Sequence, residues 1–163
     1  MMAYQILVTG SCFTGHEFRS IEPVIEEILS SAQEEVLVVA YVITESAIEL
    51  LQQLEQLAQR GVRVIFVLNN PGSFPQTVQV TLMRLLEKFA HVEVRAFSEE
   101  TGQLHAKVIV VDRQKAVIGS ANLSWGGLIA NHEVGVLVEG EPVWKLAGTI
   151  DALAGRLQRW LCQ

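Results

Sequence analysis

Two nearly continuous apolar segments, EVLVVAYV (35–42) and VRVIFVL (62–68), constrain the fold of this chain more than any other feature. A strand that is apolar at every position has both sides buried, which is typical of a parallel sheet covered by helices on both faces. Apolar residues recur at helical spacing before the first segment (21–33) and between the two segments (about 45–60). This alternation of strands and helices predicts a parallel βαβ unit in the first half of the chain.

Capping residues support the limits of these helices. Ser20 and Thr44 stand at the expected N-caps, and Gly61 is expected to end the second helix. A third helix is predicted over about 78–90, followed by a strand at VEVRAF (92–97). These elements complete the predicted parallel half.

The second half of the chain has a different organisation. Three predicted strands, at about 104–112, 115–121 and 132–139, follow one another without helices and must pair largely antiparallel. A last helix is expected within 142–161, with a broad apolar face that could serve the core or a partner chain. The predicted fold class is therefore α/β, a mixed β-sheet flanked by helices on both faces, in a single domain over residues 1–163. A chain of 163 residues, 50% of them hydrophobic, can bury such a core.

Charge and leader signals limit the partners and the compartment. The net charge is −6, whereas proteins that grip nucleic acid over their whole surface are usually basic, so any polyanion must be held locally by a few basic groups in a cleft. No basic leader opens the sequence, and no apolar run approaches the roughly 20 residues of a membrane span. We therefore expect a soluble cytoplasmic protein. Cys12 and Cys162 lack metal-ligand spacing, so neither a disulfide framework nor a zinc site is predicted.

Polar residues interrupt the predicted hairpin LHAKVIVVDRQKAVIGSANLSWGG (104–127). Side chains alternate along a strand, so His105 and Lys107 are expected on one face. Folding back about Gln114 brings residues 119–122 opposite residues 105–107. Ser120 and Asn122 share a parity and can point to the same side. Four hydrogen-bonding side chains are thus predicted to converge from two adjacent strands.

Glu133 opens the next strand, where its carboxylate could reach the ring of His105 and hold one tautomer. Any one of these polar residues alone is more typical of a satisfied core group or a turn. Together, His, Lys, Asp, Gly, Ser and Asn at fixed offsets arise by chance on the order of once in a million chains. The set therefore indicates a site.

These residues are identified as the HKD motif of the phospholipase D superfamily, HxKxxxxD followed after six residues by GSxN. Every position is matched, by His105, Lys107, Asp112, Gly119, Ser120 and Asn122. Glu133 stands where small members carry an acidic partner for the catalytic histidine. The resemblance implies that a histidine nitrogen attacks phosphorus to give a phosphohistidine, and that a second histidine protonates the leaving oxygen and then activates water. It also implies that Lys107, Ser120 and Asn122 bind the phosphate oxygens, with no metal or other cofactor.

The motif occurs once in this chain, whereas larger members of the superfamily carry two copies. The second histidine is therefore expected from a second subunit, in a two-fold homodimer whose His105 side chains meet at the axis. An internal substitute is the alternative. His91 is expected to be a surface cap at a helix end, and His132 to face away from Glu133. His16 lies with Arg19 in a Gly-rich loop that could contact phosphate.

Asp112 of the motif and three residues near it have separate expected roles. Asp112 lies roughly 23 Å of extended strand from His105, too far for shared proton chemistry, and is expected to anchor the turn through backbone N–H groups. Arg113 and Lys115 are expected on a solvated face. Trp125, followed by two glycines, borders the predicted site and could offer a stacking or apolar wall or belong to the core.

The resemblance favours a metal-independent phosphodiesterase and, because the chain is small and has a single motif, a nuclease acting on DNA or RNA. A phospholipid hydrolase or transferase is an alternative, although no amphipathic membrane-binding stretch is present. A conditionally active subunit of a larger restriction-like or phage-defence assembly is another. No base-reading motif distinguishes DNA from RNA.

Overall fold

The computed structural model describes residues 3–13, 15, 17–98 and 102–161. Its strands are β1 (Ala3–Thr9), β2 (Arg19–Ser20), β3 (Glu35–Ala40), β4 (Arg63–Asn69), β5 (Val92–Phe97), β6 (Val108–Val111), β7 (Lys115–Gly119), β8 (Glu133–Glu139) and β9 (Gln158–Arg159). Its helices are α1 (Ile21–Ser30), α2 (Ile48–Gln59), α3 (Gln76–Lys88) and α4 (Glu141–Arg156), with short turns η1 (Glu45–Ala47), η2 (Pro71–Ser73) and η3 (Gly126–Ala130). Within the described ranges, every helix is too short or too polar to cross a membrane.

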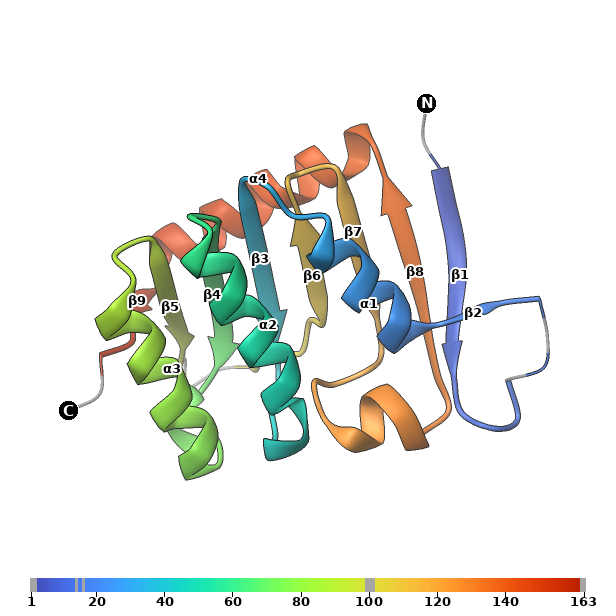
Figure 1. The fold of residues 1–163 in the computed structure, drawn as a ribbon, viewed down its shortest axis with the longest axis horizontal. Helices are drawn as coiled ribbons and strands as arrows, with labels where there is room; N and C mark the ends of the chain where they lie inside the picture. The colour runs from blue at the N-terminus through green and yellow to red at the C-terminus, as the bar shows by residue number, and fades with distance from the viewer. Residues whose placement is uncertain (1–2, 14, 16, 99–101, 162–163) are drawn as a thin grey trace.

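The strands form one mixed sheet in the order β2-β1-β8-β7-β6-β3-β4-β5-β9. Strands β3, β4 and β5 are parallel, and β6, β7 and β8 are antiparallel. Helices α1, α2 and α3 cover one face and α4 crosses the other (Figure 1). The predicted α/β class, with a mixed sheet flanked by helices on both faces, is therefore confirmed.

Two apolar cores follow from the alternation of side chains along the strands. Ile109 and Val111 of β6 pack in the core under α1, α2 and α3, whereas Leu104, Val108 and Val110 pack under α4. Lys107, just before β6, lines a hollow together with Ile21 and Ile25 of α1. Helix α4 buries its apolar stripe in the second core, which shows that this face serves the fold.

The residues predicted to cap the helices lie next to the observed helix ends. Gly61 has a φ of +89° directly after α2, as expected for a helix stop. Ser20 precedes α1 and Thr44 precedes η1, but neither side chain caps a backbone N–H. Helix α2 is preceded by a 3₁₀ turn, so its α-helical part begins at Ile48.

Long-range pairing adds strands that periodicity did not predict. β1 pairs antiparallel with β8 along its whole length, from Ala3 opposite Glu139 to Thr9 opposite Glu133. β9 pairs with β5, so the helix expected within 142–161 ends at Arg156. β6 starts only at Val108, and the segment before it, predicted as strand, is irregular. These pairings join segments far apart in sequence, which local patterns do not report.

The β6–β7 turn differs from its prediction by one residue. Val108 pairs with Ile118 and Val111 with Lys115, so the hairpin folds about Arg113 and not Gln114. Asp112 and Arg113 both have positive φ values, of 50° and 55°, as type I′ geometry requires.

Asp112 anchors this turn through backbone N–H groups, but the donors come from the entrance to β3. Its carboxylate accepts bonds of 2.9, 2.8 and 2.9 Å from the N–H groups of residues 33, 34 and 35. The expectation of a solvated Arg113 is wrong, because its guanidinium pairs with Glu35 at 3.0 Å and Asp151 at 2.8 Å. The hydrogen bond that Arg113 donates to Asp151 is the main cause of the raised pKa of Arg113. Lys115 lies 3.9 Å from Glu139. The far end of the hairpin is therefore structural.

Candidate active site

One edge of the sheet collects all the motif residues except Asp112. Parallel strands end at a common edge, and antiparallel neighbours begin there. β3, β4, β5 and β7 end at the lower edge in Figure 1, whereas β6 and β8 begin there. His105 and Lys107 precede β6, Ser120 and Asn122 follow β7, and Glu133 starts β8. These residues therefore lie at one edge of the sheet, where their contacts divide them into two groups.

His105 and Lys107 are in direct contact. The ammonium nitrogen of Lys107 lies 3.1 Å from Nδ1 of the His105 ring and donates to the His105 carbonyl oxygen at 2.7 Å. The His105 side chain is exposed at the edge, and Lys107 is half-buried. An exposed imidazole beside a fixed ammonium is arranged to meet an anionic group arriving from solvent.

Partial burial lowers the pKa of Lys107 below its usual value of 10.5, and the negative charge of Glu133 opposes this shift. Burial has this effect because it removes water from the charged ammonium. An incompletely solvated cation gains more from a bound phosphate than a fully hydrated one does. The surroundings of Lys107 therefore favour anion binding.

Tyr41, at the end of β3, is a site neighbour that the sequence reasoning missed. Its ring centroid lies 4.4 Å from that of His105 at an interplanar angle of 50°. The Lys107 ammonium lies 5.3 Å from the same ring. A polarizable aromatic ring in this position orients the imidazole and stabilises nearby positive charge. The available signal was an aromatic residue that directly follows a buried strand at the carboxyl edge of a parallel sheet.

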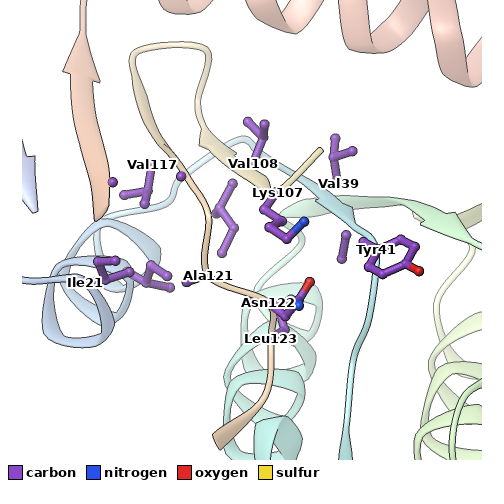
Figure 2. Close-up of a pocket in the computed structure, with 14 residues that line it drawn as sticks. Ile21, Val39, Tyr41, Lys107, Val108, Val117, Ala121, Asn122 and Leu123 are labelled. Carbon is purple, nitrogen blue, oxygen red and sulfur yellow. The ribbon is translucent and has the colours of Figure 1, made fainter. Parts of the chain in front are cut away.

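A hollow of about 390 Å³, open to solvent, lies beside these groups. Figure 2 shows Lys107 and Asn122 on this hollow, with the Tyr41 ring beside them. The rest of its lining is apolar and comes from α1, β3, β6, β7, β8 and the segment after β7. Asn122 Oδ1 is buried and has no hydrogen-bond partner among the described residues. The acceptor oxygen of the Asn122 amide is therefore unpaired beside the hollow that Lys107 also lines, and only the Nδ2 group of the same amide can donate to a phosphate oxygen.

Ser120 and Glu133 form a second group, across the β7–β8 pair. The Ser120 hydroxyl donates to Glu133 Oε2, and the backbone N–H of Val134 donates to Ser120 Oγ at 3.3 Å. Asn131 Nδ2 donates to Glu133 Oε1 at 3.4 Å. The expected contact between Glu133 and the His105 ring is not among the interactions of the described residues. Within one chain, Glu133 therefore holds Ser120 and acts on Lys107 through its charge.

Two glycines allow the site to form. A Cβ on Gly119 would lie 2.8 Å from both Gly135 Cα and the Val134 carbonyl oxygen, so β7 and β8 approach too closely for any side chain. A Cβ on Gly127 would lie 2.2 Å from the carbonyl oxygen of Asn122. The turn η3 therefore packs directly on the Asn122 backbone, because residue 127 has no side chain.

The other histidines are engaged elsewhere or not described. The His91 ring bonds the Ala58 carbonyl oxygen at 2.8 Å, so it caps the end of α2 and is half-buried. His132 Nε2 accepts a 3.1 Å bond from the Cys12 N–H. His16 lies outside the described residues. Neither described histidine joins the group around His105.

Arg19 does not reach the motif in this chain. Its guanidinium pairs with Glu27 on α1, as both the hydrogen bond and the ion pair record. The suggested phosphate contact by Arg19 therefore requires this pair to break. The described residues contain no group of three or more His, Cys, Asp and Glu side chains arranged to hold a metal ion.

The fold and the site define an α/β protein that presents a histidine, a lysine and an asparagine amide at the edge of a mixed sheet. The family model described as cardiolipin synthase, PLD-like domain, matches residues 25–154. The chain belongs to the phospholipase D superfamily.

Solved structures show the same fold at low sequence identity. Nuc, a phospholipase D family member from Salmonella typhimurium, has a TM-score of 0.76 and 20% identity, with 99% of this chain and 100% of that chain covered. NucT from Helicobacter pylori has a TM-score of 0.75 and 17% identity, with 98% and 100% covered. These likenesses extend over nearly the whole chain and concern its fold.

Curated relatives are more similar in sequence but longer. The DISARM protein DrmC of Bacillus paralicheniformis is 38% identical over 121 residues, which are 74% of this chain and 50% of that protein. The 5'-3' exonuclease PLD3 of Bos taurus is 40% identical over 91 residues, which are 55% of this chain and 18% of that protein. The chain thus spans half of one relative and less than a fifth of the other.

Proposed function

We propose that this protein is a metal-independent phosphodiesterase that hydrolyses DNA or RNA. The observation that carries the proposal is the contact between His105 and Lys107, with Asn122 on the same hollow as Lys107, within a complete HKD motif. Membership of the superfamily supports the reaction class. The exonuclease name of one relative supports a nucleic acid as substrate.

In the proposed reaction, a ring nitrogen of His105 bonds to phosphorus while the bond from phosphorus to the leaving oxygen breaks. A second imidazole gives its proton to that oxygen. Water then attacks the phosphohistidine, passes a proton to the second imidazole and releases His105. Lys107, Asn122 and Ser120 hold the phosphate oxygens and stabilise the charge of the transition state. Glu133 fixes the Ser120 hydroxyl and adds negative charge near Lys107.

The second imidazole is proposed to be His105 of another copy of this chain. His105 is exposed at the sheet edge, so its twin can approach across a two-fold axis. Neither His91 nor His132 lies in the site, so neither of these two described histidines can supply the second imidazole from within the chain. We propose a cytoplasmic homodimer built from one phospholipase D-like domain per chain.

The test uses EDTA-treated protein with single-stranded DNA, RNA, a bis-aryl phosphodiester and phosphatidylcholine in parallel. We expect turnover of a polynucleotide and of the small diester, and a loss of roughly 10³-fold or more in His105→Ala. Phosphatidylcholine turnover without polynucleotide cleavage would replace the nuclease proposal by a phospholipid hydrolase. Full activity of His105→Ala would exclude the mechanism.

A second candidate is a subunit of a larger assembly that is active only with its partners. The similarity to the DISARM protein DrmC favours it. An isolated chain that is folded and dimeric, yet inactive on every substrate above, would support this candidate over the free enzyme.

A further inference from the structure

Trp125 is a large aromatic side chain that neither the core nor the proposed chemistry uses. It is 62% exposed and stands directly before η3. In the sequence it follows Asn122 by three residues. The alternative of a core tryptophan is therefore excluded, and the indole is available to contact another molecule close in the sequence to the candidate active site.

The backbone around Trp125 is held in place from two sides. Its N–H donates to Ser46 Oγ at 2.6 Å, and the Gly127 N–H donates to Ser124 Oγ at 3.0 Å. The Gly127 backbone lies against Asn122, where no Cβ would fit. Because these contacts hold its backbone, Trp125 loses little backbone conformational entropy when a ligand binds to its ring.

The same segment is tied to the segment that carries Tyr41. Ile43 and Leu123 form a parallel bridge, in which Thr44 N–H donates to the Leu123 carbonyl oxygen at 3.0 Å. Residues 41–44 and 121–124 thus run side by side from the hollow towards Trp125. The backbone of Trp125 therefore follows directly on the segment that carries Asn122 and is tied to the segment that carries Tyr41.

Among the described residues, few cations near the site are available to bind a polyanion, so a contact with Trp125 that does not depend on charge would add to affinity. The chain carries a net charge of −6, Lys107 is the cation on the hollow, and Arg19 is paired with Glu27. Affinity from counterion release grows with the number of phosphates neutralised, so this surface gains little from it. Stacking of a base on an aromatic ring does not depend on charge. It supplies affinity that the cations do not.

We propose that Trp125 is a stacking platform for an unpaired base, so that the substrate of this site is a single-stranded polynucleotide. A base in a duplex has both faces covered by its neighbours and cannot stack on the indole. The inference rests on the proposed nuclease function and identifies its substrate class.

The test compares Trp125→Ala and Trp125→Phe with Trp144→Ala. Trp144 is 63% exposed on α4, so it is a control matched in residue type and exposure. We expect Trp125→Ala to lower the ratio of kcat/KM on single-stranded DNA to kcat/KM on the bis-aryl diester by about tenfold. Trp125→Phe retains most of this ratio, and Trp144→Ala retains all of it.

Binding is measured separately from turnover, with a labelled single-stranded oligonucleotide and its duplex in the His105→Ala background. We expect Trp125→Ala to weaken single-strand binding about tenfold and to leave duplex binding unchanged. If activity is absent from every variant but this difference in binding remains, the proposed function fails and the platform stands. Equal single-strand binding with and without the indole overturns the platform. So does a change of oligomeric state in Trp125→Ala, which would make the indole a protein contact.

Discussion

At the residue scale, the proposed chemistry depends on how Lys107 is kept charged beside an imidazole. Its ammonium is half-buried and contacts both His105 and the Tyr41 ring. Burial lowers its pKa, and Glu133 counters this effect from the next strand. The same carboxylate therefore accepts a hydrogen bond from Ser120 and, by its charge, favours the protonated form of Lys107.

The pH dependence of turnover tests this balance. If protonated Lys107 binds the phosphate, activity falls as pH rises through its lowered pKa, below the ordinary value of 10.5. Glu133→Gln removes a charge that raises this pKa, so the alkaline limb of kcat/KM on the bis-aryl diester should move to still lower pH. Lys107→Arg should remove the limb, because a guanidinium stays protonated. An identical limb in all three proteins would contradict the assignment.

Tyr41 is expected to act as a positioning residue through its ring. Tyr41→Leu should lower kcat on the bis-aryl diester by about tenfold, since aromatic pairs contribute roughly 0.5–1.5 kcal/mol beyond burial. Tyr41→Phe keeps the ring and should retain most activity. Full kcat in Tyr41→Leu would show that the ring does not position the imidazole.

At the element scale, close backbone approaches position the catalytic groups. Strand β7 lies against β8 at Gly119, and η3 lies against the Asn122 backbone at Gly127. β1 extends the sheet beyond β8 and pairs Thr9 with Glu133. The irregular segments before β6 and after β7 can therefore carry polar side chains while the strands behind them remain apolar.

Gly127→Ala tests this packing. Its Cβ would lie 2.2 Å from a backbone oxygen, so the Asn122 segment must move, and we expect a loss of about 1–3 kcal/mol in unfolding free energy together with reduced turnover. Gly148→Ala is the control, because nothing lies within 4 Å of its Cβ and α4 gains helix propensity of up to about 1 kcal/mol. Urea unfolding of both variants measures the difference. Equal stability of Gly127→Ala and the unsubstituted protein would contradict the packing.

At the scale of the whole molecule, the two faces of the sheet are covered unequally. Helix α4 packs over β3, β4, β6 and β7. On the same face of β1 and β8, Tyr4, Ile6 and Val134 are 68%, 39% and 49% exposed. This apolar area adjoins the edge that carries His105, because Val134 follows Glu133 at the start of β8. We expect it to be buried in the proposed homodimer.

Mixing experiments test the shared site. Adding an excess of His105→Ala to the unsubstituted protein should abolish most activity, because each mixed dimer lacks one imidazole. Independent active sites would keep their activity in the same mixture. The mixture is assayed on the bis-aryl diester after subunit exchange, and sedimentation confirms the dimer. A monomer that turns over would contradict the shared site.

Local patterns in the sequence determined the helices, the parallel half and the two faces of the strands in the core. They did so because periodicities of 3.6 and 2 residues decide which side chains are buried. The offsets of the HKD motif also predicted a polar group, although its place at the sheet edge came from the structure. Asp112 was correctly assigned to the turn, because its distance along the strand is set by covalent geometry.

Only the tertiary structure decided which groups touch. The pairing of β1 with β8, the late start of β6, the contact of Tyr41 with His105 and the ion pairs of Arg113 all join segments distant in sequence. It also decided that Trp125 is exposed and that Glu133 bonds to Ser120. Periodicity assigns a side chain to a face, whereas its partner on that face depends on the packing of the whole chain.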